Sequence, residues 1–436
     1  MLQQFNISNP KRSPKEYSRT NWFPYYAGFS SEFIYNILCN IENRQAFCIA
    51  DPWNGGGTTT TMANAFGFES KGVDLNPIML IAAKACLLNV LDIPSIVPIT
   101  NDIVKKSHKK YTIELKNDPL GLWLNDSSVK CFRNLELAIK HLLISPENHN
   151  LIINLEDSSG EGISCIACFF YICLFRTLRG ILKNFLGSNP TWVKIAKNEN
   201  SRIDLNSKVL INLFQQEIDI MLNKMSYDVL YSGITNARTN FSVASSELLP
   251  WQSESIDLII TSPPYCTRID YAVATMPELA ILGIGNESGF SNLRRNLIGT
   301  TTVPKNPIDI SSNWGDTCTS FLNKVYNHSS RASKTYYYKS HTSYFNSIFL
   351  SLNEINRVLK KNGNCIIVVQ DSYYKDIHNN LPQILIEMSQ HKGLKIKLRK
   401  DFRSNTAISS INPRVKKYRS STLATESVIC LEKIND

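Results

Sequence analysis

The stretch Phe47-Cys48-Ile49-Ala50-Asp51-Pro52-Trp53-Asn54-Gly55-Gly56-Gly57-Thr58-Thr59 decides the fold. Its apolar residues 47–50 predict a short buried strand, and the pattern after the glycines, through Phe66, predicts a helix. Glycines let the backbone approach a ligand closely because they carry no side chain. A strand, a glycine turn and a helix in this order are typical of an α/β fold that binds its ligand at the carboxyl end of a parallel strand.

The next predicted strand ends in an acid. Residues 71–76 read Lys-Gly-Val-Asp-Leu-Asn, and Asp74 follows the glycine turn by about 20 residues. From that position a carboxylate can accept hydrogen bonds from ribose hydroxyls. The glycine turn does not show the Gly-x-Gly-x-x-Gly pattern of dinucleotide-binding folds, so a dehydrogenase is a distant alternative.

A third motif, Thr261-Ser262-Pro263-Pro264-Tyr265, follows the apolar run 256–260 and is expected where a buried strand emerges into a loop. Its two prolines fix φ and donate no hydrogen bond, which leaves a stiff loop rich in carbonyl acceptors. Ser262 and the Pro263 carbonyl can accept the protons of an exocyclic amine, while Tyr265 stacks on the ring that carries it. Taken alone, so short a motif leaves open that Pro-Pro only ends a strand and Tyr265 only fills space.

Together these motifs resemble those of S-adenosylmethionine-dependent amino-methyltransferases, which methylate exocyclic nitrogens of DNA bases. The loop 261–265 is similar to their catalytic motif, and its serine form looks most like the cytosine-N4 branch. Trp53, Gly55 and Gly57 match their aromatic-x-Gly-x-Gly cofactor motif, with Asp51 ahead of it, and 72–77 resembles the adjoining ribose motif.

The resemblance implies a role for each matched residue. The expected catalytic residues are Ser262, Pro263, Pro264 and Tyr265. The expected residues for binding S-adenosylmethionine are Phe29, Asp51, Trp53, Gly55, Gly57 and Asp74. Phe29 belongs to the aromatic segment 21–29, which resembles the segment that covers the methionine end of the cofactor in this family; simple packing by an aromatic cluster is the alternative. Ser245, Ser246 and Glu247 stand where the family often has an acid near the adenine ring.

The implied fold is α/β, a class I methyltransferase with a Rossmann-like, mostly parallel sheet and an inserted helical domain. Residues 1–84 are expected to hold the lid segment and the cofactor-binding half, and 236–436 the catalytic half. Between them, 85–235 is expected to be a helical insertion, because segments near 129–145, 162–185 and 205–228 have helical apolar spacing.

A formal charge of +10 and a pI near 8.9 favour a polyanionic partner. Two basic regions are candidates for target recognition: the insertion, with 105–110 and 176–183, and the aromatic-rich stretch from Arg294 to Lys339. A charge run is more often a solvated face, and the sequence leaves open which region, if either, reads the target. Arg268 is a further candidate for a phosphate contact, and Asp270 is expected either to position Tyr271 or to form a local surface ion pair.

Eleven cysteines in mostly apolar surroundings are unlike a secreted disulfide framework and indicate a reducing cytoplasm. The longest uncharged apolar run, 162–175, is too short for a membrane span and predicts a buried helix, so no membrane partner is expected. Cys165 and Cys168 lie in this run without a second Cys/His pair at ligand spacing, and no metal site is predicted.

The resulting hypothesis is a site-specific DNA methyltransferase that transfers a methyl group to the N4 amine of cytosine, in restriction-modification or phage defence. Its expected partners are double-stranded DNA with a flipped base and cognate restriction or defence proteins. The alternatives are adenine-N6 methylation, an RNA amino-methyltransferase, or an inactive DNA-binding subunit. The intact motifs at Gly55–Gly57 and Ser262–Tyr265 argue against loss of activity.

Overall fold

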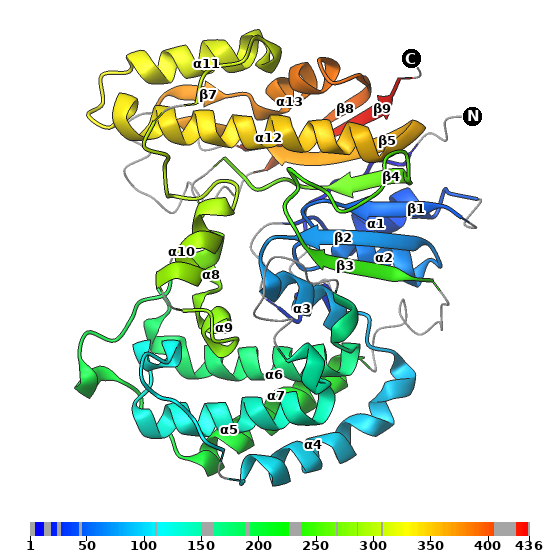
Figure 1. Cartoon of the computed structure of the whole chain (residues 1–436). Coiled ribbons are helices and arrows are strands. Elements are labelled where there is room, and N and C mark those ends of the chain that lie inside the picture. The colour runs from blue at the N-terminus through cyan, green and yellow to red at the C-terminus, as the bar shows by residue number, and fades with distance from the viewer. Residues whose placement is uncertain are drawn as a thin grey trace.

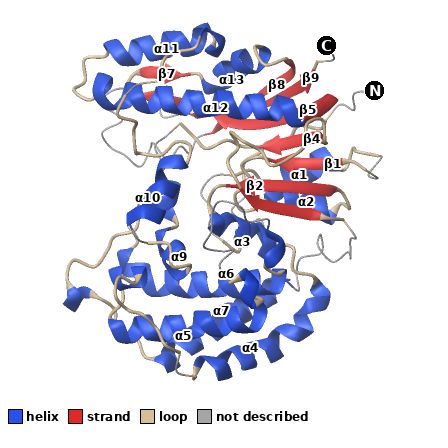
Figure 2. Cartoon of the chain, viewed as in Figure 1, coloured by secondary structure: helices blue, strands red, loops and turns tan. Residues whose placement is uncertain are grey.

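A seven-stranded, mostly parallel sheet forms the centre of the chain (Figures 1 and 2). The computed structural model describes residues 5–12, 19–23, 28–42, 46–109, 111–149, 160–187, 192–225, 237–266, 269–285, 287–306, 308–404 and 424–434. The strand order is β3-β2-β1-β4-β5-β9-β8, and β9 runs antiparallel to the other six strands. In that order the strands are Thr239–Val243, Glu69–Asp74, Cys48–Asp51, Ile256–Thr261, Leu359–Gln370, Ala424–Lys433 and Leu394–Ser404. The predicted Rossmann-like α/β fold is confirmed.

The two central strands, β1 and β4, are almost entirely buried because both faces of the sheet are covered there. Successive residues of a strand point to opposite faces, so each strand contributes to two cores. Ile49 and Leu258 pack against α1 and α2 on one face, whereas Ala50 and Ile259 pack against α11, α12 and α13 on the other. These helices are α1 (Ser31–Leu38), α2 (Thr58–Ala65), α11 (Asp316–Asn327), α12 (Tyr338–Val358) and α13 (Leu381–Gln390).

The first residues of two helices show when capping residues in the sequence predict a helix start and when they do not. The sequence offers Ser30 or Ser31 as the cap of helix α1, and the cap is Ser30, whose hydroxyl accepts a hydrogen bond from the Phe33 N–H at 3.1 Å. For helix α12 the apolar pattern predicts a start at Tyr344, but the helix starts at Tyr338 after a π-helical turn, Ser333–Tyr337. No side chain caps this start, so the sequence carries no signal for it.

A group of helices lies below the sheet in Figure 1 and precedes β3 in the chain. Helices α5, α6 and α7 correspond to the three segments predicted to be helical. They share one apolar core with α3 and α9, so the helical segment is packed directly against residues near the sheet. The bounds are α3 (Pro77–Ala85), α4 (Ile93–Ser107), α5 (Asp126–Leu143), α6 (Cys165–Ile181), α7 (Ser207–Met225) and α9 (Met276–Ile281).

Helix α6 is the centre of this group. With the short 3-10 turn Leu182–Phe185 it is long and apolar enough to cross a bilayer, and among the described residues it alone passes as an unbroken helix. Two thirds of its most apolar window is buried inside the chain, against α3, α5, α7 and α9. This burial is what a core helix requires, in agreement with the prediction for 162–175.

The remaining elements follow the predicted catalytic loop. Helices α10 (Glu287–Asn296) and α8 (Tyr271–Ala274) lie between the sheet and the helical group in Figure 1, and α9 packs on α6 below them. A small antiparallel hairpin of β6 (Ser372–Tyr374) and β7 (Ile377–Asn379) extends from the end of β5. The catalytic loop is therefore followed by a helical bridge between the two main parts of the chain.

Candidate active site

The predicted site residues Asp51 and Ser262 come from the ends of two adjacent strands, β1 and β4. Thr261, the last residue of β4, donates a hydrogen bond of 2.5 Å to Asp51 Oδ1, and the Trp53 N–H donates to the same oxygen at 3.0 Å. Asp51 is buried, and this burial raises the pKa of its carboxyl group to about 7. Asp51 therefore holds together the start of the loop after β4 and the start of the glycine turn. It does not line the large cavity described below.

The glycine turn holds the acid at the end of β2. The Gly55 N–H donates to Asp74 Oδ2 at 3.0 Å, and the Asn76 N–H donates to Asp74 Oδ1 at 2.9 Å. Burial raises the pKa of Asp74 to about 6, although these two hydrogen bonds favour the charged form. Both oxygens keep lone pairs for further donors.

Gly57 allows the turn to pack closely on α3. Its φ is +81°, a conformation that a residue with a side chain adopts at a cost, and a Cβ there would lie 2.6 Å from the Cβ of Ala83. Gly57 thus has a structural reason to be glycine. It lies in the turn between Trp53 and α2 but is not itself a wall of the cavity.

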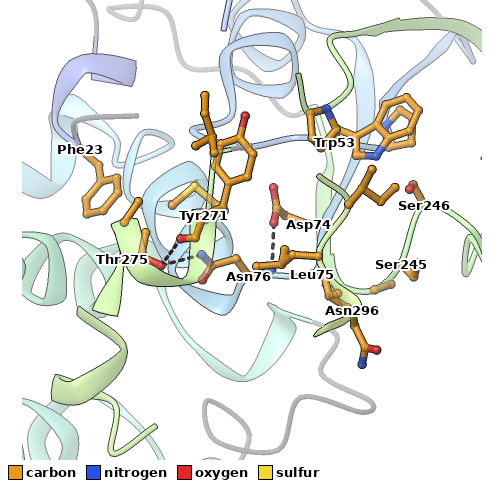
Figure 3. Close-up of a pocket in the computed structure, with 18 of the residues that line it drawn as sticks. Phe23, Trp53, Asp74, Leu75, Asn76, Ser245, Ser246, Tyr271, Thr275 and Asn296 are labelled. Atoms are coloured by element: carbon orange, nitrogen blue, oxygen red, sulfur yellow. Dashed lines mark hydrogen bonds between the residues drawn. The ribbon is translucent and has the colours of Figure 1, made fainter. Parts of the chain in front are cut away.

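A cavity of about 340 Å³ lies at the carboxyl ends of the strands, on the side of the helical group (Figure 3). Figure 3 shows Asp74 between Trp53 and Tyr271, with Ser246 and Ser245 below Trp53 at the right. Of the predicted site residues, Trp53, Asp74 and Pro264 line the cavity, and so do Ser245 and Ser246. Glu247 instead lines a smaller adjoining cavity. Other residues in the wall are Phe23, Leu75, Asn76, Met79, Arg179, Ile269, Tyr271, Thr275, Asn296 and Leu297.

The loop after β4 is held firmly by α12. The Tyr344 hydroxyl donates to the Pro264 carbonyl at 2.9 Å. Two residues further along the loop, Cys266 Sγ lies 3.2 Å from His341 Nδ1. Burial raises the pKa of Cys266 to about 12, so its thiol is protonated at neutral pH and can donate this hydrogen bond. The predicted catalytic residues therefore form a rigid loop, fastened on both sides of Tyr265.

Phe29 lies apart from the cavity. Its side chain is buried against Phe33, with their ring centroids 5.5 Å apart, in the core beneath α1 and α2. An aromatic residue of the same N-terminal segment, Phe23, lines the cavity instead. The structure does connect Phe29 to the site through Arg12, whose Nε donates to the Phe29 carbonyl and whose guanidinium also donates to Thr58 at the start of α2.

Asp270 is not part of a surface ion pair. Its side chain is buried, accepts a 2.6 Å hydrogen bond from Arg294, and is bonded by the Thr301 hydroxyl at 2.7 Å. It also caps α8 by accepting from the Val273 N–H. Asp270 thus fixes the helix that carries Tyr271 into the cavity wall, which is the positioning role given as one of its two predicted alternatives.

The predicted basic regions are arranged differently from each other. In 176–183, Arg176 pairs with Glu217, and Arg179 pairs with the fully buried Glu278 at 2.5 Å. These two arginines hold helices together, and Arg179 faces the cavity.

The run 105–110 ends α4, far from the loop after β4 in Figure 1, and Lys110 lies outside the described residues. Arg295 lines the small cavity beside Tyr344, whereas Arg268 lies outside the described residues.

The residues present fit S-adenosylmethionine. A ribose diol needs acceptors such as the Asp74 carboxylate, and the adenine ring needs flat apolar walls such as Leu75 and Pro264. The hydroxyls of Ser245 and Ser246 supply polar contacts at one side of the cavity. A sulfonium cation is favoured near the negative charge of Asp74. Among the described residues there is no cluster of three or more His, Cys, Asp or Glu side chains arranged to hold a metal ion.

The family comparison matches the half of the fold that carries the catalytic loop. Residues 256–433, from β4 through β9, match the family model whose description is DNA methylase, of the N6/N4 type. Residues 256–433 thus match the N4/N6 DNA methylase family, which supports the resemblance to amino-methyltransferases that the sequence motifs carry. Such enzymes use S-adenosylmethionine, as the motifs implied, and the cavity at Asp74 agrees with that cofactor.

Two curated relatives resemble a longer part of the chain. The Type II methyltransferase M.AvaI of Nostoc sp. is 24% identical over 319 residues, which cover 67% of this chain and 59% of the relative. The Type II methyltransferase M.BsoBI of Geobacillus stearothermophilus is 25% identical over 314 residues, which cover 67% of this chain and 58% of the relative. The chain thus spans less than two thirds of the length of these relatives.

Solved structures give only distant likenesses. A SAM-dependent methyltransferase from Methanosarcina mazei aligns with a TM-score of 0.29 and 8% identity, covering 92% of this chain and 98% of the other. A mutant of the 16S rRNA (adenine(1408)-N(1))-methyltransferase from Catenulisporales acidiphilia aligns with a TM-score of 0.21 and 9% identity, covering 51% of this chain and 72% of the other. Superpositions this poor carry no argument about the site.

Proposed function

We propose that this chain is a site-specific DNA methyltransferase of type II restriction-modification, which transfers a methyl group from S-adenosylmethionine to the N4 amine of cytosine. The observation that carries the proposal is the position of Ser262. Its hydroxyl is buried at the end of β4, on the loop whose Pro264 lines the cavity with Asp74. A neutral hydroxyl stands where a carboxylate is the alternative in this family, and the serine form favours the cytosine branch.

The loop supplies the acceptors that an aromatic amine needs. The lone pair of such an amine is delocalised into the ring, so the amine is a weak nucleophile until its hydrogens are drawn out of the ring plane. Ser262 and the Pro263 carbonyl would accept those hydrogens and orient the lone pair toward the methyl group that S-adenosylmethionine supplies. Because Tyr344 fastens the adjacent Pro264 carbonyl, the loop needs little reorganisation during the reaction.

Each cofactor residue has a proposed task. Asp74 would accept hydrogen bonds from the ribose hydroxyls, and Trp53 would form one wall beside them. Asp51, Gly55 and Gly57 would act through the turn, since they hold Asp74 and the strand ends in place. The Phe29 contact with the methionine end would require its ring to leave the buried position against Phe33.

The proposed substrate is double-stranded DNA with its target base flipped out of the stack. The Ser262 hydroxyl oxygen is buried and cannot reach an amine inside a duplex, so the base must enter the loop region. Tyr265 is only partly buried and presents a ring on which the extruded base would stack. The net charge of +10 supports binding to the DNA backbone. A cognate restriction or defence protein and a cytoplasmic location belong to the same proposal.

A polymer and base assay tests this function. The purified chain is incubated with S-adenosylmethionine labelled in its methyl group and with DNA or RNA from a host that lacks methyltransferases. Label in 4-methylated deoxycytidine is the expected result. Label in methylated deoxyadenosine would reassign the base, and label in RNA alone would reassign the polymer. DNA binding without methyl transfer would favour an inactive recognition subunit. Methylated deoxyadenosine, label in RNA alone and binding without transfer each contradict the proposal.

A further inference from the structure

Methyl transfer requires the donor and the acceptor to be held in a fixed relation. Under the proposed function, Asp74 at the end of β2 would bind the ribose of the cofactor, whereas Ser262 and Tyr265, after β4, would hold the target base. A misplacement of about 1 Å between reacting groups can slow a reaction about 100-fold. Any direct connection between these two sides of the cavity therefore bears on the rate of transfer.

Asn76 is fixed on the cofactor side of the cavity. It follows Asp74 by two residues, and its N–H donates to Asp74 Oδ1 at 2.9 Å. Its side-chain oxygen accepts from the Ile78 N–H at 3.1 Å and so caps helix α3. With this oxygen held by the cap, the amide nitrogen Nδ2 points to Thr275 and donates to its hydroxyl at 2.9 Å. Asn76 is buried, so water competes little for these bonds.

Thr275 receives this bond on the other side of the cavity. It lies between α8 and α9, and its hydroxyl donates to the Tyr271 carbonyl at 2.9 Å. Tyr271 and Ile269 form a small buried cluster against which Tyr265 packs. Hydrogen bonds and packing thus connect the proposed ribose acceptor to the ring on which the base would stack.

Dashed lines in Figure 3 mark the hydrogen bonds that run from Asp74 through Asn76 and Thr275 to Tyr271. We infer that Asn76 and Thr275 are positioning residues for methyl transfer. Their hydrogen bond sets the distance between the Asp74 carboxylate and Tyr271, and the packing of Tyr265 on Tyr271 extends this control to the base. This role rests on the proposed function, in which Tyr265 holds the base beside the cofactor.

Helix α8 is fastened at both ends to other parts of the chain. At its start, Asp270 accepts from Arg294 of α10 at 2.6 Å. At its end, the Ala274 carbonyl accepts from the guanidinium of Arg179, which belongs to α6. These contacts tie α8 to α10 and to the helical group, whereas Asn76 ties the residue after Ala274 to the strand end that carries the ribose acceptor. Without the Asn76 bond, α6 and α10 would determine where α8 lies, and its alignment with β2 would loosen.

Two substitutions break this bond with little other change. Thr275→Val replaces the hydroxyl by a methyl group of similar size, and Asn76→Ser keeps a cap for α3 but cannot reach Thr275. With S-adenosylmethionine bound in advance and DNA from a methylation-free host as substrate, each variant should lower the single-turnover rate by at least about 10-fold. The affinities for cofactor and DNA should change little, because positioning acts in the transition state. Since both variants remove the same bond, the rate loss of the double variant should be smaller than the product of the two single losses.

A rescue variant and a matched control separate positioning from a merely structural role. Thr275→Ser keeps the hydroxyl and should transfer methyl groups at nearly the wild-type rate. Thr100→Val is the control, because Thr100 and Thr275 are both 6% exposed and the Thr100 hydroxyl likewise donates to the carbonyl four residues earlier, that of Ile96, at 2.7 Å. Thr100 lies in α4 and does not line the cavity. Its variant should keep the wild-type rate, so that a loss in Thr275→Val reflects the contact with Asn76.

A second readout needs neither cofactor nor DNA. In hydrogen exchange of the chain alone, the amides of residues 271–275 should exchange faster in Thr275→Val than in the wild type or in Thr275→Ser, whereas Thr100→Val should affect mainly α4. An active wild type with a full rate in Thr275→Val, unchanged exchange in 271–275, or a rate loss matched by an equal loss of cofactor affinity overturns the positioning role alone. A wild type that transfers no methyl group to DNA overturns the proposed function on which this role rests.

Discussion

Thr261 Oγ1 lies 2.5 Å from Asp51 Oδ1, and this hydrogen bond joins the last residue of β4 to the last residue of β1. The two strands lead into the predicted catalytic loop and the glycine turn. Because neither partner is exposed, the bond couples the positions of the two motifs without contacting the cavity. The residues expected to bind cofactor and the residues expected to hold the target amine thus share one buried anchor.

Asp51→Asn should change how stability depends on pH. The folded-state pKa of Asp51 is raised to about 7 from an ordinary value of 3.8, so folding favours its protonated form. The stability of the wild type should therefore fall as pH rises through the window between about 4 and 7, by roughly 4 kcal/mol at most. Urea unfolding at several pH values should show a flatter profile in Asp51→Asn. The control Asp102→Asn, on the exposed side of α4, should keep the wild-type dependence of unfolding free energy on pH. A wild type whose unfolding free energy stays constant or rises between about pH 4 and 7 would contradict the prediction.

Asp74→Ala should weaken S-adenosylmethionine binding by about 10- to 100-fold, because hydrogen bonds to a charged acceptor are lost. In the wild type, affinity should rise as pH increases through about 6, where the Asp74 carboxylate ionises. Isothermal titration calorimetry of cofactor without DNA measures both effects. Equal affinities in wild type and variant would remove Asp74 from the cofactor site.

Gly57→Ala should destabilise the fold more than Gly67→Ala. Both glycines have a φ near +80°, at +81° and +82°, so both substitutions introduce similar backbone strain. Only at Gly57 does the new Cβ collide with a neighbour, the backbone and side chain of Ala83, whereas the space beside Gly67 is open. Thermal unfolding of the two variants isolates the cost of close packing. The same loss of stability at both positions would contradict this account of the glycine turn.

Arg179→Met should cost about 3–5 kcal/mol of unfolding free energy, because it leaves the buried carboxylate of Glu278 without its partner. The matched change Arg238→Met breaks a pair with Glu161 whose side chains are 70% and 68% exposed, and should cost less than about 1 kcal/mol. Chemical denaturation of both variants gives the comparison. A small effect at Arg179 would mean that Glu278 takes up a proton or finds other donors.

The sequence could predict the parts of the site that follow directly from a strand. Asp51, Trp53 and the glycines follow β1, Asp74 ends β2, and Ser262 follows β4, so an apolar run and the next few residues identify each of them. Parallel strands bring these positions to one edge of the sheet, and the structure places Trp53, Asp74 and Pro264 at one cavity.

The rest of the site depends on contacts that no local pattern records. Arg179 comes from α6 and Tyr271 from α8, yet both face the same cavity as Asp74. The sequence predicts Phe29 at the cofactor site, but an aromatic residue near a motif can serve core packing equally well. Phe29 packs in the core, and Phe23 of the same segment lines the cavity.

Mass spectrometry of nucleosides from a methylation-free host that expresses this chain tests the central claim most directly. The account predicts 4-methylated deoxycytidine in the DNA with the wild type and none with Ser262→Ala or Tyr265→Ala, although both purified variants still bind S-adenosylmethionine nearly as well as the wild type. Ser255→Ala, at the other end of β4, is the control that should keep the product. The same product with Ser262→Ala would contradict the proposed division of roles, and so would an equal loss of cofactor binding in Ser262→Ala, Tyr265→Ala and Asp74→Ala. If the wild type produces no 4-methylated deoxycytidine, the proposed reaction is contradicted.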